Sequence, residues 1–275
     1  MEVTKVLNEV IKFILFAFLI VLISKYILVT TLRKLAESLN LKAKTAGDIA
    51  GMATSVPELL TITTSSIRGL QGASIYNILS SNIINLIQFL GTIFLNKNIA
   101  KLKNRAIIID MIFVGITILI PIVLLQLDIK LDMFIVPLFL IFYALFAYLN
   151  SNIHKVYLKN EQKEFSKGII DVKKIILYIF ILLITGILLY IVGDLLGNSL
   201  ENLCKIFNVP QLIVGVLLGF ITSIPELMSF FESQKYNKKE NDEMLGVVEA
   251  TNNLLTSNTL NLFVIQTIGI IIINR

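Results

Sequence analysis

Runs of about 20 apolar residues recur along this chain, and they restrict its possible folds more than any other feature. Eight such runs lie near residues 12–32, 46–68, 72–95, 105–127, 132–151, 170–203, 209–233 and 244–273. Each run could cross the hydrocarbon core of a bilayer as an α-helix. The composition agrees, since 56% of the residues are hydrophobic and only 16% are charged. We therefore expect an all-α polytopic membrane protein with about eight transmembrane helices, folded as a single integral membrane domain over residues 1–275.

Lysine and arginine residues gather in alternate loops between the expected helices. Eighteen of the 24 lie in the segments 25–44, 97–105, 155–174 and 235–239. These segments share one side of the membrane if the chain alternates. Because cytoplasmic loops are enriched in Lys and Arg, we expect this side to be the cytoplasm and the N-terminus to lie outside, in the plasma membrane. The net charge of +5 has the same explanation, and we expect no nucleic-acid partner.

The N-terminal segment MEVTKVLNEVIKF lacks the features of a cleaved signal peptide, so we expect the first helix to be retained. The single cysteine, Cys204, excludes an intrachain disulfide and a Cys-based metal cage. Under the orientation above, Cys204 should lie close to the outer surface. His154 falls in the Lys-rich loop and should be solvated.

Two segments far apart in the chain repeat one motif. GDIAGMATSVPEL over 47–59 aligns with GVLLGFITSIPEL over 215–227, and seven of the 13 positions are identical. A second block follows each copy, NILSSNIIN over 77–85 and NLLTSNTLN over 253–261, in which three Asn, one Ser and one Leu recur. The duplication includes the rare polar residues of both blocks, which makes it a strong signal.

The two motif copies lie on the second and seventh expected helices, so they should cross the membrane in opposite directions. Repeat 1 covers about 46–95 in the first half of the chain, 1–150, and repeat 2 covers about 209–273 in the second half, 170–275. Inverted repeats are common in secondary transporters, which bind substrate near the midplane where the repeats meet.

Each motif places a proline and a glutamate side by side inside an apolar helix. Pro57 and Pro225 lack the N–H that the carbonyl four residues back would accept. Such loosened carbonyls persist in a membrane only when they are buried in protein or line a wet cavity. A carboxylate at the centre of a membrane helix costs about 2.5–3.5 kcal/mol on insertion scales. A bound divalent cation would offset that cost for Glu58 and Glu226, because Ca²⁺ takes oxygen ligands from carboxylates, carbonyls and amides.

Polar residues spaced four apart form one stripe on each partner helix and supply neutral oxygens that suit Ca²⁺ or Na⁺. The stripes consist of Asn77, Ser81 and Asn85 on the third helix, and of Asn253, Ser257 and Asn261 on the eighth. Glu249 extends the second stripe one turn toward the cytoplasm, where repeat 1 has Ala73.

These residues also have purely structural interpretations. Proline can simply kink a helix, and Asn or Ser can simply join helices, but duplication together with two glutamates favours an ion site. Two GxxxG pairs, Gly47 with Gly51 and Gly215 with Gly219, are expected to allow close helix packing with no ligand role. Asp194 is expected to make a polar contact inside the sixth helix.

The two TSxPE motifs and their SNxxN blocks resemble the α-repeats of the cation/calcium exchanger superfamily, especially its sodium/calcium exchanger branch. The resemblance implies that Glu58 and Glu226 are the central metal ligands. It implies further ligands from Thr54, Ser55, Thr222, Ser223, Ser81, Asn85, Ser257 and Asn261. It also implies exchange of Ca²⁺ for Na⁺ by alternating access, with the first and sixth helices sliding across the core.

Three features depart from the family's pattern. Several members carry an aspartate where Asn261 stands, so this site would hold less negative charge. Ser80 and Thr256 replace the glycine usually found before the SN pair. The family usually has ten helices and this chain about eight. The chain could therefore work without the last two, need a second copy of itself or a partner subunit, or be a non-transporting ion-binding subunit.

We expect a secondary active cation antiporter, and no enzyme, that exchanges Ca²⁺ for Na⁺ and uses no cofactor besides the transported ions. Proton-coupled Ca²⁺ exchange is an alternative, because protons could neutralise desolvated Glu58 and Glu226. An intramembrane aspartyl protease is a remote alternative, built on Asp48 and Asp194, which each follow a glycine. That alternative leaves the duplicated glutamates unexplained.

Overall fold

The computed structural model describes residues 2–39, 41–67, 71–127, 129, 131–157, 171–207, 210–239 and 242–274, and every element within these ranges is a helix. Before residue 158 the helices are α1 (Glu2–Ile23), the π-helical η1 (Ser24–Val29), α2 (Thr30–Ser38), α3 (Ala43–Thr54), α4 (Val56–Ile67), α5 (Gln71–Leu95), the 3-10 helix η2 (Ile99–Lys103), α6 (Arg105–Gln126) and α7 (Ile135–Tyr157). After residue 170 they are α8 (Val172–Phe207), α9 (Gln211–Thr222), α10 (Ile224–Lys239), α11 (Glu243–Leu260), the π-helical η3 (Asn261–Ile265) and α12 (Gln266–Ile273).

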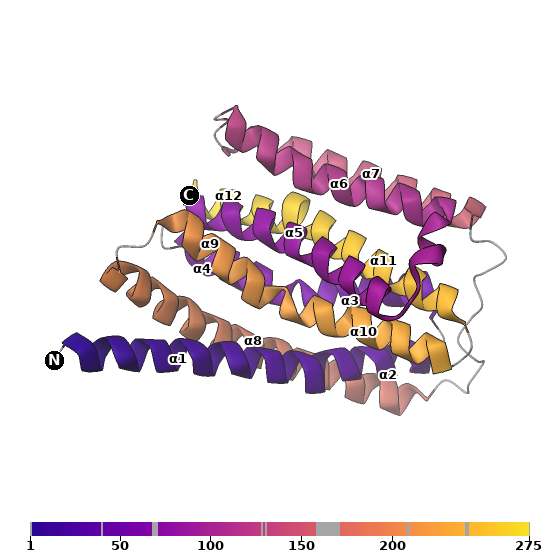
Figure 1. The fold of residues 1–275 in the computed structure, drawn as a ribbon, viewed down its shortest axis with the longest axis horizontal. Coiled ribbons are helices and arrows are strands. Elements are labelled where there is room, and N and C mark those ends of the chain that lie inside the picture. The colour runs from indigo at the N-terminus through magenta and orange to yellow at the C-terminus, as the bar shows by residue number, and fades with distance from the viewer. Residues whose placement is uncertain are drawn as a thin grey trace.

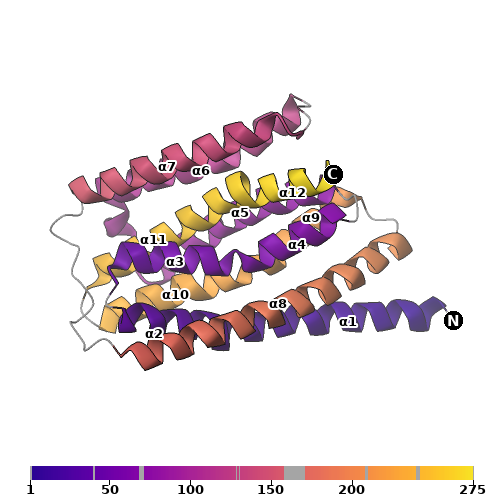
Figure 2. The same ribbon diagram turned by 180° about the vertical axis from the view of Figure 1, so that it is seen from behind.

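The helices form three layers (Figures 1 and 2). One outer layer consists of α8 and of the rod formed by α1, η1 and α2. The middle layer holds α3, α4, α5, α9, α10, α11 and α12, and the opposite outer layer is the hairpin of α6 and α7. Both outer layers expose many large apolar side chains, as lipid-facing helices do. Polar side chains are buried in the middle layer, so the outer layers shield them from lipid.

Seven helical stretches of the described residues are long and apolar enough to cross a membrane: Val6–Ser38, Ser74–Leu95, Arg105–Gln126, Ile135–Ile153, Val172–Phe207, Gly215–Lys238 and Glu243–Ile273. They match seven of the eight expected spans and confirm an all-α polytopic membrane fold. The other expected span, 46–68, forms α3 and α4, whose many Thr and Ser residues lower its hydropathy. The first helix begins earlier than expected, at Glu2, and its N-terminal part includes an ion pair of Glu9 with Lys12 at 2.8 Å.

Both motif helices are interrupted at the serine of the motif. Ser55 separates α3 from α4, and Ser223 separates α9 from α10. Their N–H groups still donate to the carbonyls of Gly51 and Gly219, each at 3.2 Å, so the chain continues almost helically through the break. The segment α3–α4 and the segment α9–α10 run in opposite directions along the bundle (Figures 1 and 2).

Glycines allow the motif helices to touch helices from the other half of the chain. A Cβ atom on Gly51 of α3 would lie 2.6 Å from the carbonyl oxygen of Asn253 on α11. A Cβ on Gly219 of α9 would lie 2.8 Å from the carbonyl oxygen of Asn77 on α5. Both distances are shorter than real Cβ contacts, which confirms the close-packing role expected for these glycines.

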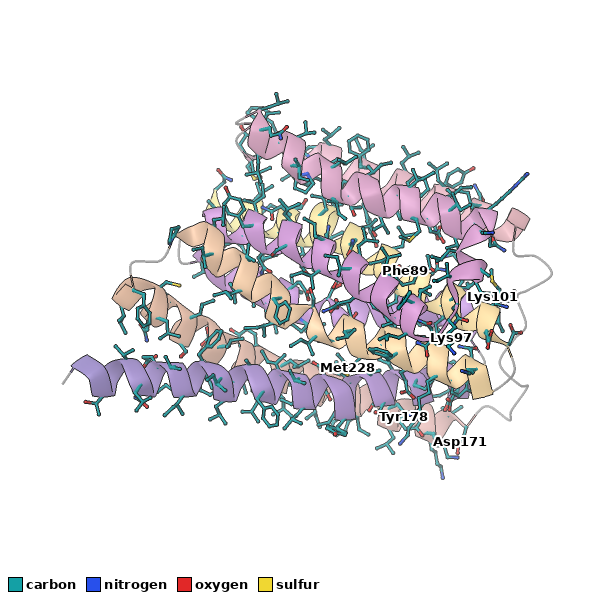
Figure 3. All side chains as sticks on the ribbon, viewed as in Figure 1. Phe89, Lys97, Lys101, Asp171, Tyr178 and Met228 are labelled. Atoms are coloured by element: carbon teal, nitrogen blue, oxygen red, sulfur yellow. The ribbon has the colours of Figure 1, made fainter. Side chains whose placement is uncertain are left out.

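One end of the bundle gathers the basic loops. We call it the lysine-rich end; its described lysines include Lys42, Lys97, Lys101, Lys103, Lys235 and Lys238. Figure 3 shows Lys97 and Lys101 at this end, together with Asp171, which precedes α8. Both chain termini lie at the opposite end (Figure 1), as does the last turn of α8, which contains Cys204. The structure places the backbone of His154 in α7 rather than in the Lys-rich loop. The side chain of His154 and the loop over 158–170 lie outside what the structure describes.

A thiol-labelling experiment tests which end faces the cytoplasm. Cys204 is the only cysteine and is partly exposed, so an impermeant maleimide should label it from outside the cell. The matched control is Cys204→Ala with Lys103→Cys, a variant that should react only from the cytoplasm. Labelling of Cys204 from the cytoplasmic side alone would reverse the orientation.

A second experiment tests the glycine contact. Gly51→Ala should destabilise the protein by about 1–3 kcal/mol, the usual range for overpacking, because its methyl group meets backbone atoms of α11. Gly186→Ala in α8 is the control, since nothing lies within 4 Å of a Cβ there. The measurement is the thermal unfolding midpoint in detergent. Equal midpoints for the two variants would contradict the close-packing role.

Candidate functional site

The two glutamates of the repeated motif begin the second half of each interrupted helix. Glu58 lies in the first turn of α4 and Glu226 in the first turn of α10, and both side chains are fully buried. The first turn of a helix presents free N–H groups and the positive end of the helix dipole. The break at the preceding serine therefore creates a favourable place for a carboxylate inside the bundle.

Serine hydroxyls connect each glutamate to the other half of the chain. Ser81 of α5 donates to Glu58 Oε1 at 2.8 Å, and its hydroxyl lies 2.9 Å from that of Ser223 at the opposite break. Ser257 of α11 repeats this arrangement. It donates to Glu226 Oε1 at 3.0 Å, and its hydroxyl lies 2.9 Å from that of Ser55. Each stripe serine thus joins the carboxylate of its own repeat to the break in the other motif helix, in two matching sets of hydrogen bonds. We call these two sets, together with the threonines of the breaks and with Asn85 and Asn261, the cluster.

Four buried oxygen atoms of this cluster have no hydrogen-bond partner among the described residues. They are Glu58 Oε2, Glu226 Oε2, Asn85 Oδ1 and Asn261 Oδ1. A buried polar atom left unpaired costs about 1–3 kcal/mol, and more when it is charged. Carboxylate and amide oxygens are the hard ligands that Ca²⁺ and Na⁺ prefer. These atoms are therefore candidate ligands for a transported cation.

A reciprocal contact of two asparagines holds the amide groups in place. Asn82 donates to the carbonyl of Asn258 at 3.2 Å, and Asn258 donates to the carbonyl of Asn82 at 3.1 Å, which joins α5 to α11. Their side-chain oxygens then accept from Asn261 and Asn85, each at 3.2 Å. This fixes the Nδ2 atoms of Asn85 and Asn261 and leaves their Oδ1 atoms free. Sequence reasoning assigned Asn82 and Asn258 no role, although their recurrence in both blocks was a usable signal.

The threonines of the motif lie at the same breaks. Thr54 Oγ1 donates to the carbonyl of Ala50 at 2.9 Å and lies 3.5 Å from Asn253 Oδ1. Thr222 Oγ1 lies 3.4 Å from the carbonyl of Gly219. Both side chains are fully buried, and their oxygens keep lone pairs that could face an ion.

All ten sequence-predicted site residues are buried in the middle layer of the bundle. The first residue of each stripe is directed elsewhere, because Asn77 donates to Thr61 at 2.9 Å and Asn253 donates to Ser229 at 2.7 Å. Glu249 is not part of the cluster either. It forms an ion pair with Arg33 of α2 at 2.6 Å.

The charge of the cluster is the second reason to expect a cation. No ion pair within the described ranges involves Glu58 or Glu226. Two carboxylates buried without a counter-charge are strongly unfavourable in a low-dielectric interior. Within the same ranges no three His, Cys, Asp or Glu side chains gather, so the donor set combines two carboxylates with neutral oxygens. Such a set fits alkali and alkaline-earth cations better than transition metals.

Solved structures with a similar fold include those of the sodium-calcium exchanger NCX_Mj. The one soaked with 10 mM Na⁺ and zero Ca²⁺ has a TM-score of 0.60 and 20% identity, and the match covers 97% of this chain and 83% of that chain. The one soaked with 2.5 mM Na⁺ and 10 mM Sr²⁺ has a TM-score of 0.58, 21% identity and the same coverage. The one soaked with 2.5 mM Na⁺ and 0.1 mM Ca²⁺ has a TM-score of 0.58 and 20% identity, over 96% of this chain and 82% of that chain.

No curated protein matches the chain. A family model does: the model described as sodium/calcium exchanger protein matches residues 9–152 and 177–274. These ranges include both motifs, both SNxxN blocks and all ten candidate ligands. The chain therefore belongs to the sodium/calcium exchanger family.

Proposed function

We propose that this cation exchanger moves Ca²⁺ in exchange for Na⁺ by alternating access, with the buried cluster around Glu58 and Glu226 as the ion site. The observation that carries the proposal is the set of four buried oxygens without partners, two of them on the glutamates. A cation at the cluster would satisfy these oxygens and balance the two negative charges at once.

Each class of residue has its own task in this proposal. Glu58 and Glu226 supply charge and the central oxygens, and Asn85 and Asn261 supply amide oxygens. The hydroxyls and carbonyls at the two breaks complete the set of ligands, together with the two serines of the stripes: Thr54, Ser55, Thr222, Ser223, Ser81 and Ser257. Since two carboxylates balance one Ca²⁺ or two Na⁺, occupation of shared oxygens by one kind of ion would exclude the other and enforce exchange.

The outer layer of α1 and α8 supports an alternating-access mechanism. Near the end of the bundle that holds the N-terminus, Ser199 of α8 donates to the backbone carbonyl of Glu9 at 2.9 Å, and Asn202 donates to Glu9 Oε2 at 3.3 Å. These bonds join the two long helices to each other. The pair could therefore slide across the middle layer as one unit and uncover the ion site from one end at a time.

Proton-coupled Ca²⁺ exchange is the second candidate. It is favoured by the lack of any basic side chain paired with Glu58 or Glu226 in the described part of the chain. Protons could neutralise these carboxylates while the cation is away. A Na⁺-coupled cycle is preferred, because the amide and hydroxyl oxygens of the cluster can bind Na⁺ and do not take up protons near neutral pH.

The protease alternative is not retained, because the family consists of transporters. The two aspartates on which it rested have separate structural contacts. Asp48 accepts from Lys44 at 2.8 Å and from Thr256 at 3.1 Å. Asp194 accepts from Asn198 at 3.1 Å, the polar contact that was expected inside this helix.

Neutralising either glutamate tests the ion site. Glu58→Gln and Glu226→Gln should each abolish Ca²⁺ flux into proteoliposomes, because amides keep the shape of the side chains and remove the charge. Glu243→Gln, a half-exposed carboxylate at the lysine-rich end, is the control and should keep normal flux. The measurement is ⁴⁵Ca²⁺ uptake by protein that elutes as a single species. Normal flux in either site variant would refute the assignment.

Imposed gradients test the coupling ion. Wild-type ⁴⁵Ca²⁺ uptake should follow an opposed Na⁺ gradient at fixed pH. Asn85→Ala and Ser257→Ala should weaken the dependence on Na⁺ more than the apparent affinity for Ca²⁺, because they remove neutral oxygens and leave both carboxylates. Uptake that ignores Na⁺ and follows a pH gradient would replace the sodium proposal with the proton-coupled one.

A further inference from the structure

A third buried carboxylate lies outside the ion site. Glu249 of α11 is 3% exposed and precedes Ser257 by eight residues, a rise of about 12 Å along a helix toward the lysine-rich end. Repeat 1 has Ala73 at the corresponding position, so the repeat provides no equivalent carboxylate. The proposed ion site does not use this residue, and its burial calls for an explanation.

The guanidinium of Arg33 lies against this carboxylate and donates to both of its oxygens. Arg33 Nη1 donates to Glu249 Oε2 at 3.0 Å and Nη2 donates to Oε1 at 2.6 Å, in a two-pronged contact. Ser233 of α10 donates to Oε1 at 2.8 Å, and Asn237 donates to Oε2 at 3.1 Å. The guanidinium also lies 4.5 Å from the ring centre of Tyr236. Each carboxylate oxygen of Glu249 thus accepts one hydrogen bond from the guanidinium of Arg33 and one from a neutral side chain.

This ion pair joins two layers of the bundle. Arg33 belongs to α2, at the end of the outer rod, whereas its partners belong to α10 and α11 of the middle layer. The side chains of Arg33 and Glu249 are only 10% and 4% exposed. Any sliding of the outer rod across the middle layer must therefore separate them.

A polar route leads from this pair toward the ion site. A cavity of about 20 Å³, enough for one water, is lined by Arg33, Glu249, Glu232 and Ser229. Ser229 accepts from Asn253 at 2.7 Å, and Asn253 Oδ1 lies 3.5 Å from the hydroxyl of Thr54 in the cluster. Arg33 thus stands between the lysine-rich end and a short chain of polar groups that reaches the cluster.

We propose that Arg33 is a tethered cation that closes the lysine-rich entrance, and that Glu249 binds the transported cation when α2 moves away. The inference rests on the proposed exchange of cations by alternating access. Arg33 cannot lose its charge, and removing one partner of a buried ion pair leaves the other charge uncompensated at a high cost. The entrance therefore opens readily only when a cation such as Ca²⁺ or Na⁺ replaces the guanidinium at Glu249, with Ser233 and Asn237 as further oxygen donors. Opening is thereby linked to the arrival of an ion.

The rate at which a thiol reagent reaches the cavity reports whether the entrance is closed, and this measurement does not require transport. Ala50 of α3 lines the cavity and is buried, so Ala50→Cys in a Cys204→Ala background is the reporter. An impermeant maleimide added from the lysine-rich side should label it slowly. Arg33→Gln should raise the labelling rate at least about tenfold, because the pair that holds the layers together is lost. Lys34→Gln, on the exposed face of the same helix, is the matched control and should leave the rate unchanged.

Calcium ions then test the binding role of Glu249. In Arg33→Gln, added Ca²⁺ should slow labelling, because the ion occupies Glu249 beside the reporter. In the double variant Arg33→Gln with Glu249→Gln, labelling should be fast and insensitive to Ca²⁺. The exchanged pair Arg33→Glu with Glu249→Arg should restore slow labelling. This variant provides the test of the ion pair if Arg33→Gln does not fold.

Two results would overturn the inference. One is unchanged labelling in Arg33→Gln, or fast labelling in the exchanged pair. The other is equal slowing by Ca²⁺ in the single and double variants, which would place the ion elsewhere. Failure of the proposed function is distinguishable, because it would appear as wild-type vesicles that lack cation exchange while the labelling rates still respond to Arg33.

Discussion

Two carboxylates buried without a counter-charge are the constraint around which this molecule is arranged. Glu58 and Glu226 each accept one serine hydroxyl and keep one oxygen unpaired. Such groups are costly inside a bilayer unless they are shielded from lipid and paired with other groups or ions. The apolar outer layers provide the shielding, and the family's transported cations can provide the neutralisation.

The middle layer brings the polar groups together through small residues. Gly51 and Gly219 let backbones approach where a methyl group would collide, and the serine breaks place each glutamate in the first turn of its own half-helix. The reciprocal contact of Asn82 and Asn258 then fixes the distance between the two stripes. Helix packing and the proposed ion site therefore depend on the same few contacts, and a change in one is expected to affect the other.

Much of the fold and most of the candidate site could be predicted from the sequence, because both produce patterns within short stretches of the chain. Apolar runs predicted seven spans that the structure contains, and duplication identified Glu58 and Glu226. The pair of Arg33 and Glu249 was not predictable, since its members lie 216 positions apart and neither belongs to a duplicated block. The sequence placed Glu249 on the polar stripe, but only the three-dimensional structure, in which the side chain of Arg33 reaches α11, reveals its partner.

Each motif helix packs on a helix from the other half: α3 contacts α11, and α5 contacts α9. This packing between the two halves of the chain has a consequence for biosynthesis. When the first half of the chain has left the ribosome and entered the bilayer, Glu58 already has Ser81 beside it, but Ser223 and Asn258 have not yet been translated. The nascent protein must hold this acidic residue in the membrane before the helices of the second half that enclose it are present. Maturation of this exchanger is therefore expected to be most vulnerable to delay between its two halves.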